Sequence, residues 1–143
     1  MFKKLIQTND DVALLVLRIL LGVVFIPHGM QKILGFSGTM QMFTTNLHIP
    51  WIFAFLAIMA EFLGSWGLIT GLFTRVAAFG IAVNMLVAVY MLHWQNGFFM
   101  NWFGNQKGEG YEYHILVVAI ALALMIKGGG KWSIDRALTE KVK

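Results

Sequence analysis

No cysteine occurs among the 143 residues, which excludes disulfide bonds, thiolate metal sites and thiol–disulfide exchange carried out by this chain alone. Charged residues are also scarce, at 13%, whereas 58% of the residues are hydrophobic. The mean hydropathy of +0.70 is higher than that of ordinary soluble domains. The composition therefore predicts an integral membrane protein whose redox chemistry, if it has any, depends on a bound small molecule or a partner.

Four apolar segments, at 12–34, 49–69, 76–92 and 113–126, are candidates for membrane spans. About 20 apolar residues are needed to cross the hydrocarbon core, and the last segment is short by this measure. Pro50 suits a first helical turn, Gly71 a helix stop and Thr74 an N-cap. We expect an all-α membrane protein, a four-helix transmembrane bundle that forms a single domain over residues 1–143.

The distribution of basic residues orients this bundle, because short cytoplasmic segments carry an excess of Lys and Arg. Only Lys32 and Lys107 fall on the opposite side, so we expect both termini in the cytoplasm and a multi-pass protein of the bacterial cytoplasmic membrane. The net charge of +4 then reflects topology, and no nucleic-acid binding is expected. The basic residues assigned to the cytoplasmic side are Lys3, Lys4, Arg75, Lys127, Lys131, Arg136, Lys141 and Lys143.

Two charged residues are expected inside the bilayer, where ionisable groups mark a functional or structural site. Glu61 lies near the middle of the second segment, on a helical face of small residues that must contact protein rather than lipid. Arg18 is the basic residue predicted to neutralise it, and Asn84 is predicted to complete the hydrogen bonding. Such a pair could fix the helix register, or it could serve a proton or substrate role.

All four histidines, His28, His48, His93 and His114, fall near the outer end of the predicted bundle. Imidazoles there could bind a metal, contact a quinone carbonyl or cap helix ends. No HxxxH or HxxH spacing occurs, so we assign no metal site. A regular helix would direct His93 away from Asn84.

No nucleotide-binding, nucleophile-elbow or c-type haem motif is present in the chain. A quinone is the cofactor or substrate that best suits a chain without these motifs. It can reach a site from the bilayer, and it needs only hydrogen-bond donors for its carbonyl groups. The outer ends of the first, third and fourth segments supply such groups together with carboxylate and imidazole neighbours. The predicted site comprises His28, Lys32, Trp94, Tyr111, Glu112, Tyr113 and His114.

The motif LRILLGVVFIPHGMQKILGF at 17–36 resembles the opening of the DoxX family. The resemblance continues over nearly the whole chain, with AEFLG at 60–64, GLFTR at 71–75, NGFF at 96–99, GYEY at 110–113 and SID at 133–135 in the family's order. It departs at His114, where the family has a small apolar residue. The best-marked family positions correspond to Arg18, His28, Gly29, Lys32, Glu61, Gly71, Arg75, Gly110, Tyr111, Glu112 and Tyr113.

Similarity to this family implies a four-helix membrane protein linked to oxidoreductase systems, including thiosulfate:quinone oxidoreductase subunits and the oxidative-stress response. The leading hypothesis is therefore a quinone-linked oxidoreductase component that acts with a partner redox protein or subunit. A non-catalytic assembly factor and a small transporter or proton path centred on Glu61 are the alternatives. The lipid bilayer is the other expected partner, and a homo-oligomer is possible.

Overall fold

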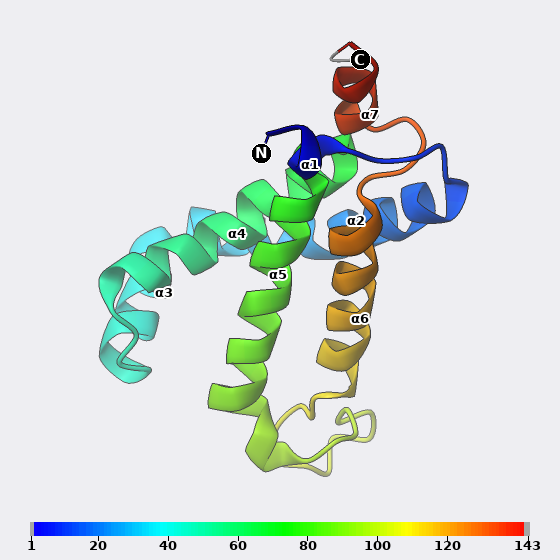
Figure 1. Ribbon diagram of the computed structural model, residues 1–143. Helices are drawn as coiled ribbons and strands as arrows, with labels where there is room; N and C mark the ends of the chain where they lie inside the picture. The colour runs from blue at the N-terminus through cyan, green and yellow to red at the C-terminus, as the bar shows by residue number, and fades with distance from the viewer. Residues whose placement is uncertain (1, 142–143) are drawn as a thin grey trace.

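The computed structural model describes residues 2–141, and every regular element in that range is helical. Figure 1 shows how these helices are arranged. In chain order they are α1 (Phe2–Ile6), α2 (Val12–Leu34), α3 (Phe36–Gln41), the π-helix η1 (Met42–Asn46), α4 (Trp51–Thr70), α5 (Thr74–Ala88), the π-helix η2 (Val89–His93), the 3₁₀-helix η3 (Trp94–Asn96), α6 (Glu112–Lys127) and α7 (Ile134–Lys141).

Three stretches among the described residues are long and apolar enough to cross a membrane. They are α2, α4 and the continuous helix from Thr74 to Asn96, and they coincide with the first three predicted segments. The fourth segment is also helical, but α6 has only 16 residues. The prediction of an all-α membrane protein with these helices is therefore confirmed, and three of them have the length of a membrane span.

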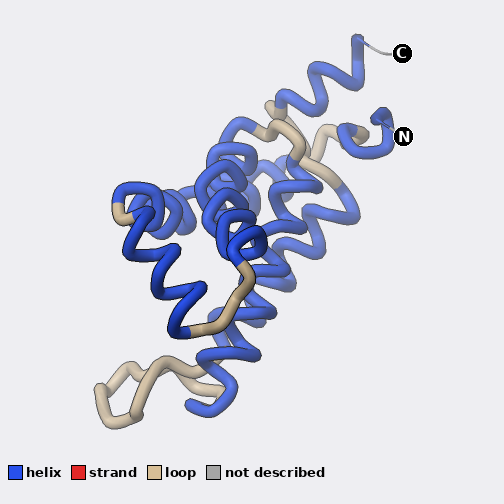
Figure 2. Tube along the Cα trace, turned by 90° about the vertical axis from the view of Figure 1, so that its left-hand side faces the viewer, coloured by secondary structure: helices blue, strands red, loops and turns tan. Residues whose placement is uncertain are grey.

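The chain reverses direction between its helices, so that distant segments meet at two ends of the molecule. At one end, which we call the terminal end, α1 and α7 pack together near the turn between α4 and α5 (Figure 1). At the other, the loop end, residues 97–111 connect η3 to α6 and form the long loop visible as a tan coil in Figure 2. Helix α5 packs against both α4 and α6.

Two glycines allow α2 and α4 to approach closely. A Cβ atom on Gly29 would lie 2.7 Å from the Cα atom of Phe62, and one on Gly22 would lie 3.0 Å from the carbonyl oxygen of Ser65. Small residues at such contacts are the usual means by which membrane helices pack. The two contacts define an antiparallel register in which Gly29 lies beside Glu61.

The buried core lies where α2, α4, α5 and α6 meet. It is entirely aliphatic apart from Phe25 and Met85, and its fully enclosed members include Leu68, Ile81 and Leu124. The opposite faces of these helices expose large apolar side chains. This pattern fits helices surrounded by lipid, because hydrocarbon solvates such side chains as well as a protein interior does.

The turn between α4 and α5 was predicted correctly at Gly71 and incorrectly at Thr74. Gly71 ends α4 in the left-handed conformation, with φ = 68°. Thr74 is the first helical residue of α5 rather than its N-cap, because Asp135 of α7 caps this helix instead. The Asp135 carboxylate accepts hydrogen bonds from the backbone N–H groups of Phe73 and Thr74, both at 2.8 Å.

Candidate functional site

An ion pair lies between the long helices α2 and α4. The ammonium group of Lys32 donates a hydrogen bond to Oε2 of Glu61, and the side chains are 23% and 8% exposed, respectively. From α5, Nδ2 of Asn84 lies 3.5 Å from Oε1 of Glu61 and donates to the carbonyl oxygen of Ala57 at 2.7 Å. Three helices thus meet at one carboxylate, and a buried carboxylate requires such partners.

Helix α6 brings two further polar groups to this region. The hydroxyl group of Tyr113 and Nδ1 of His114 are both buried, and neither has a hydrogen-bond partner among the described residues. Tyr113 also interacts electrostatically with Glu61. Buried polar groups are nearly always paired in native proteins, so two unpaired groups on neighbouring residues are ones whose bonding a ligand or water can complete.

His93 extends this cluster toward the loop end. Its ring centroid lies 4.1 Å from that of His114, and its Nδ1 atom lies 2.8 Å from the carbonyl oxygen of Glu109. His93 ends η2, a π-helical continuation of α5, so the helix is not regular between Asn84 and His93. Isolated π-helical turns occur often at functional sites. Here the turn ends at the histidine that contacts α6.

We call the side chains of Lys32, Glu61, Asn84, Tyr113, His114 and His93 the polar cluster. Tyr113 and His114 are adjacent in the chain, and their ring centroids lie 5.6 Å apart. Three of the residues predicted to form a quinone site, Lys32, Tyr113 and His114, belong to this cluster.

The other predicted site residues lie elsewhere. Trp94 stacks on Tyr111 with ring centroids 5.4 Å apart, at the loop end. Oε1 of Glu112 accepts hydrogen bonds from the backbone N–H of Met100 and from Nε1 of Trp102, both at 3.1 Å, and so it holds the loop in place. His28 has an exposed side chain whose ring lies 5.9 Å from that of Phe25.

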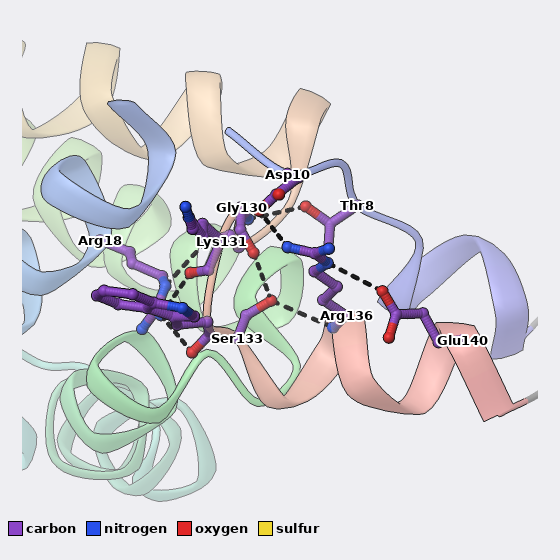
Figure 3. Close-up of polar contacts among 10 residues, drawn as sticks. Thr8, Asp10, Arg18, Gly130, Lys131, Ser133, Arg136 and Glu140 are labelled. Atoms are coloured by element: carbon purple, nitrogen blue, oxygen red, sulfur yellow. Dashed lines mark hydrogen bonds and ion pairs between the residues drawn. The ribbon is translucent and has the colours of Figure 1, made fainter. Parts of the chain in front are cut away.

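The predicted pairing of Arg18 with Glu61 is wrong. The guanidinium group of Arg18 is buried, and it donates hydrogen bonds to backbone carbonyl groups at the terminal end. Nε bonds to Gly129 at 2.8 Å, Nη1 to Leu68 at 2.9 Å and Nη2 to Trp132 at 2.9 Å. Further bonds reach the carbonyl groups of Ile69 and Lys131. Figure 3 shows this guanidinium beside the 130–133 turn.

The helix register explains the error. Gly22 packs against the segment from Ser65 to Ile69. Arg18, one turn earlier in α2, therefore lies at the C-terminal end of α4, away from Glu61. Lys32 lies one turn after Gly29, which contacts Glu61 directly. Because side chains in a helix lean toward its N-terminus, Lys32 reaches back to the carboxylate.

A second group of charges fastens the two ends of the chain together (Figure 3). Arg136 of α7 pairs with Asp10 near the N-terminus and with Glu140 one turn along α7. The hydroxyl group of Thr139 donates to the carbonyl oxygen of Ile6 at 2.9 Å. Burial raises the pKa of the Asp135 carboxyl, while its two backbone donors and Arg18 oppose that rise. These contacts give Asp10, Asp135 and Arg136 structural roles at the terminal end.

Comparison with known proteins identifies a family for this chain. The model of the DoxX family matches residues 13–94, which include α2, α4, α5 and the Lys32–Glu61 pair. The chain belongs to the DoxX family. The "Inner membrane protein YqjF" of Escherichia coli (strain K12) is 31% identical over 132 residues, which is 92% of this chain and 96% of that protein.

Two further relatives have names that refer to an activity or to a location. The "Putative oxidoreductase CatD" of Bacillus subtilis (strain 168) is 28% identical over 80% of this chain and 79% of its own. The "Inner membrane protein YphA" of Escherichia coli (strain K12) is 29% identical over 87% of this chain and 89% of its own. No solved structure matches. This DoxX-family chain is thus a multi-pass protein of the bacterial cytoplasmic membrane.

Proposed function

We propose that this DoxX-family protein is the membrane component of a quinone-linked oxidoreductase system, and that the polar cluster receives the quinone head group. The observation that carries the proposal is that the polar cluster contains two buried groups without a partner, the Tyr113 hydroxyl and His114 Nδ1, together with the Lys32–Glu61 ion pair. The name of one relative, "Putative oxidoreductase CatD", also supports a role in an oxidoreductase system.

The chemistry of the cluster suits a quinone. Quinone carbonyl groups are acceptors, and Tyr113 and Lys32 are donors whose side chains lie between membrane helices. Reduction of a quinone also takes up protons, and Glu61 and His114 are groups that exchange them. His28 is left out of the proposed site because its exposed ring contacts Phe25.

A partner must supply the electrons in this proposal. The chain has no cysteine and no c-type haem motif, so it cannot hold a thiol redox centre or that haem itself. We therefore infer a partner redox protein or subunit that docks on the membrane component and exchanges electrons with the quinone.

We further propose that α6 is a fourth span and that both termini lie in the cytoplasm. At 1.5 Å per residue the 16 residues of α6 cover about 24 Å, which is short for a bilayer. Its connections support the proposal, because α6 runs from the loop end to α7, and α7 packs against α1. The basic residues at the terminal end support the cytoplasmic side.

Quinone binding to the purified protein in nanodiscs tests the site. Tyr113→Phe removes only the unpartnered hydroxyl group, and we expect it to weaken quinone binding by about tenfold, the equivalent of one lost hydrogen bond. Tyr90→Phe is the matched control, because the side chain of Tyr90 is 85% exposed, and it should bind as the wild type does.

Equal quinone affinity in the wild type and Tyr113→Phe would refute the site assignment. No measurable quinone binding in any of these proteins would favour the assembly-factor hypothesis. In that case the protein would act through the partner that co-purifies with it.

A further inference from the structure

The polar cluster contains a histidine pair that quinone binding alone does not explain. His114 is buried and His93 is half-buried, and His93 lies at the loop end of the continuous helix formed by α5 and η2. One of the ring nitrogens of His114 has no partner among residues 2–141, whereas Nδ1 of His93 contacts the backbone of the exposed loop.

We propose that His93 and His114 form a proton relay between the loop-end solvent and the carboxylate of Glu61. The purpose of this relay rests on the proposed function, in which Glu61 stands beside the quinone head group. The movement of a proton along it requires only the described side chains and water.

The geometry supplies the steps in order. His93 is half-buried and bonds to Glu109 of the exposed loop, so it can exchange a proton with solvent. Its ring centroid lies 4.1 Å from that of His114, so a proton can pass between the imidazoles directly or over one water molecule. The last step leads from His114 past the adjacent Tyr113 ring, whose centroid lies 5.6 Å from that of His114, and over water to the Glu61 carboxylate.

Proton balance requires no other reactant. Nδ1 of His93 donates to the Glu109 carbonyl oxygen, so Nε2 of His93 takes up the proton and passes it to His114. His114 then releases a proton toward Glu61, and each histidine returns to its starting charge. The proton taken from solvent ends on Glu61, whose carboxylate becomes neutral. In the opposite direction the same steps return the proton to the loop side.

The charged and titratable groups around the relay come from α2, α6, η2 and the loop. Lys32 of α2 holds the Glu61 carboxylate, and Tyr113 of α6 adjoins His114. In the loop, the carboxylate of Glu109 accepts from the backbone N–H of Asn101 at 2.8 Å, so its carbonyl rather than its charge meets His93. Tyr90 of η2 is exposed and lies outside the path.

A pH-jump measurement on protein in nanodiscs tests the relay without any quinone. Infrared spectroscopy follows the carboxylic C=O band of Glu61, which is identified by its loss in Glu61→Gln. After a rapid drop in pH, we expect His93→Ala to slow the appearance of this band by about a hundredfold, the lower end of the effect of a positioned proton-transfer group. Added imidazole should restore the wild-type rate.

His114→Ala should behave in the same way, and His93→Ala keeps the test valid if the buried variant does not fold. His28→Ala is the matched control, since its exposed ring contacts Phe25 rather than the cluster, and it should leave the rate unchanged. Wild-type rates in both relay variants, or a slowing that imidazole does not rescue, would overturn the proposal. A failure of quinone binding would leave this measurement unaffected, so the two proposals fail separately.

Discussion

Removing one partner of the Lys32–Glu61 pair should destabilise the protein strongly, whereas removing both partners should cost much less. Taking two charges out of water is costly, and their attraction offsets that cost only while both are present. Asn84 adds a hydrogen-bond donor on the other carboxylate oxygen. The pair is therefore a weak source of net stability, but either charge alone would be strongly unfavourable.

We predict that Lys32→Ala and Glu61→Ala each destabilise the protein by about 3–5 kcal/mol, and that the double variant is more stable than the sum of these losses implies. Thermal unfolding in detergent, arranged as a double-mutant cycle, measures the coupling. Arg18→Ala combined with Glu61→Ala is the matched control, because Arg18 bonds to carbonyl groups at the terminal end. Those two changes should be additive, and additivity in the Lys32–Glu61 cycle would contradict the observed pair.

The partners of Arg18 could not have been predicted from the sequence. They are backbone carbonyl groups in a glycine-rich turn and at the end of α4. Every residue has a backbone carbonyl group, so the sequence does not show which of them accept hydrogen bonds. Asn84 was different, because an amide on a face of small residues already indicated a contact within the bundle. Lys32 was expected near a ligand, but its pairing with Glu61 depends on the register of α2 and α4.

At the scale of single helices, the close packing of α2 on α4 positions the ion pair. Gly29 lies against the backbone of Glu61 and Phe62, so any side chain there would push the two helices apart. The segments and most helix ends followed from hydropathy, glycine and proline. The short elements α1, α3 and α7 were missed, because they are too short or too polar to give a membrane signal.

We predict that Gly29→Ala lowers the stability of the protein and disturbs the polar cluster, since the new Cβ atom would lie 2.7 Å from the Cα atom of Phe62. The loss should be about 1–3 kcal/mol, the usual cost of overpacking. Gly38→Ala in α3 is the control, because nothing lies within 4 Å of its Cβ position. Unfolding in detergent measures both variants, and equal stabilities would show that α2 and α4 are not in close contact at Gly29.

For the whole molecule, the contacts between the two ends of the chain support the proposal of four spans. Three spans would leave α1 and α7 on opposite sides of the membrane, but Thr139 bonds to Ile6 and Arg136 pairs with Asp10. These contacts support our proposal that helix α6 is a fourth span, which returns the chain from the loop end toward the terminal end. A span this short is accommodated by local thinning of the bilayer or by snorkelling of a terminal basic side chain, and Lys127 ends α6.

We predict that reporter fusions at the N-terminus and after Lys143 both report the cytoplasm, while one inserted near Lys107 reports the exterior. The basic residues at the terminal end favour the cytoplasmic side, and the loop that contains Lys107 lies at the opposite end of the bundle. A fusion in the turn after α4, near Leu72, should agree with both termini. An exterior signal from the C-terminal fusion alone would mean that α6 does not cross. It would also be incompatible with the contact between α1 and α7, and with a proton relay that opens at the outer face.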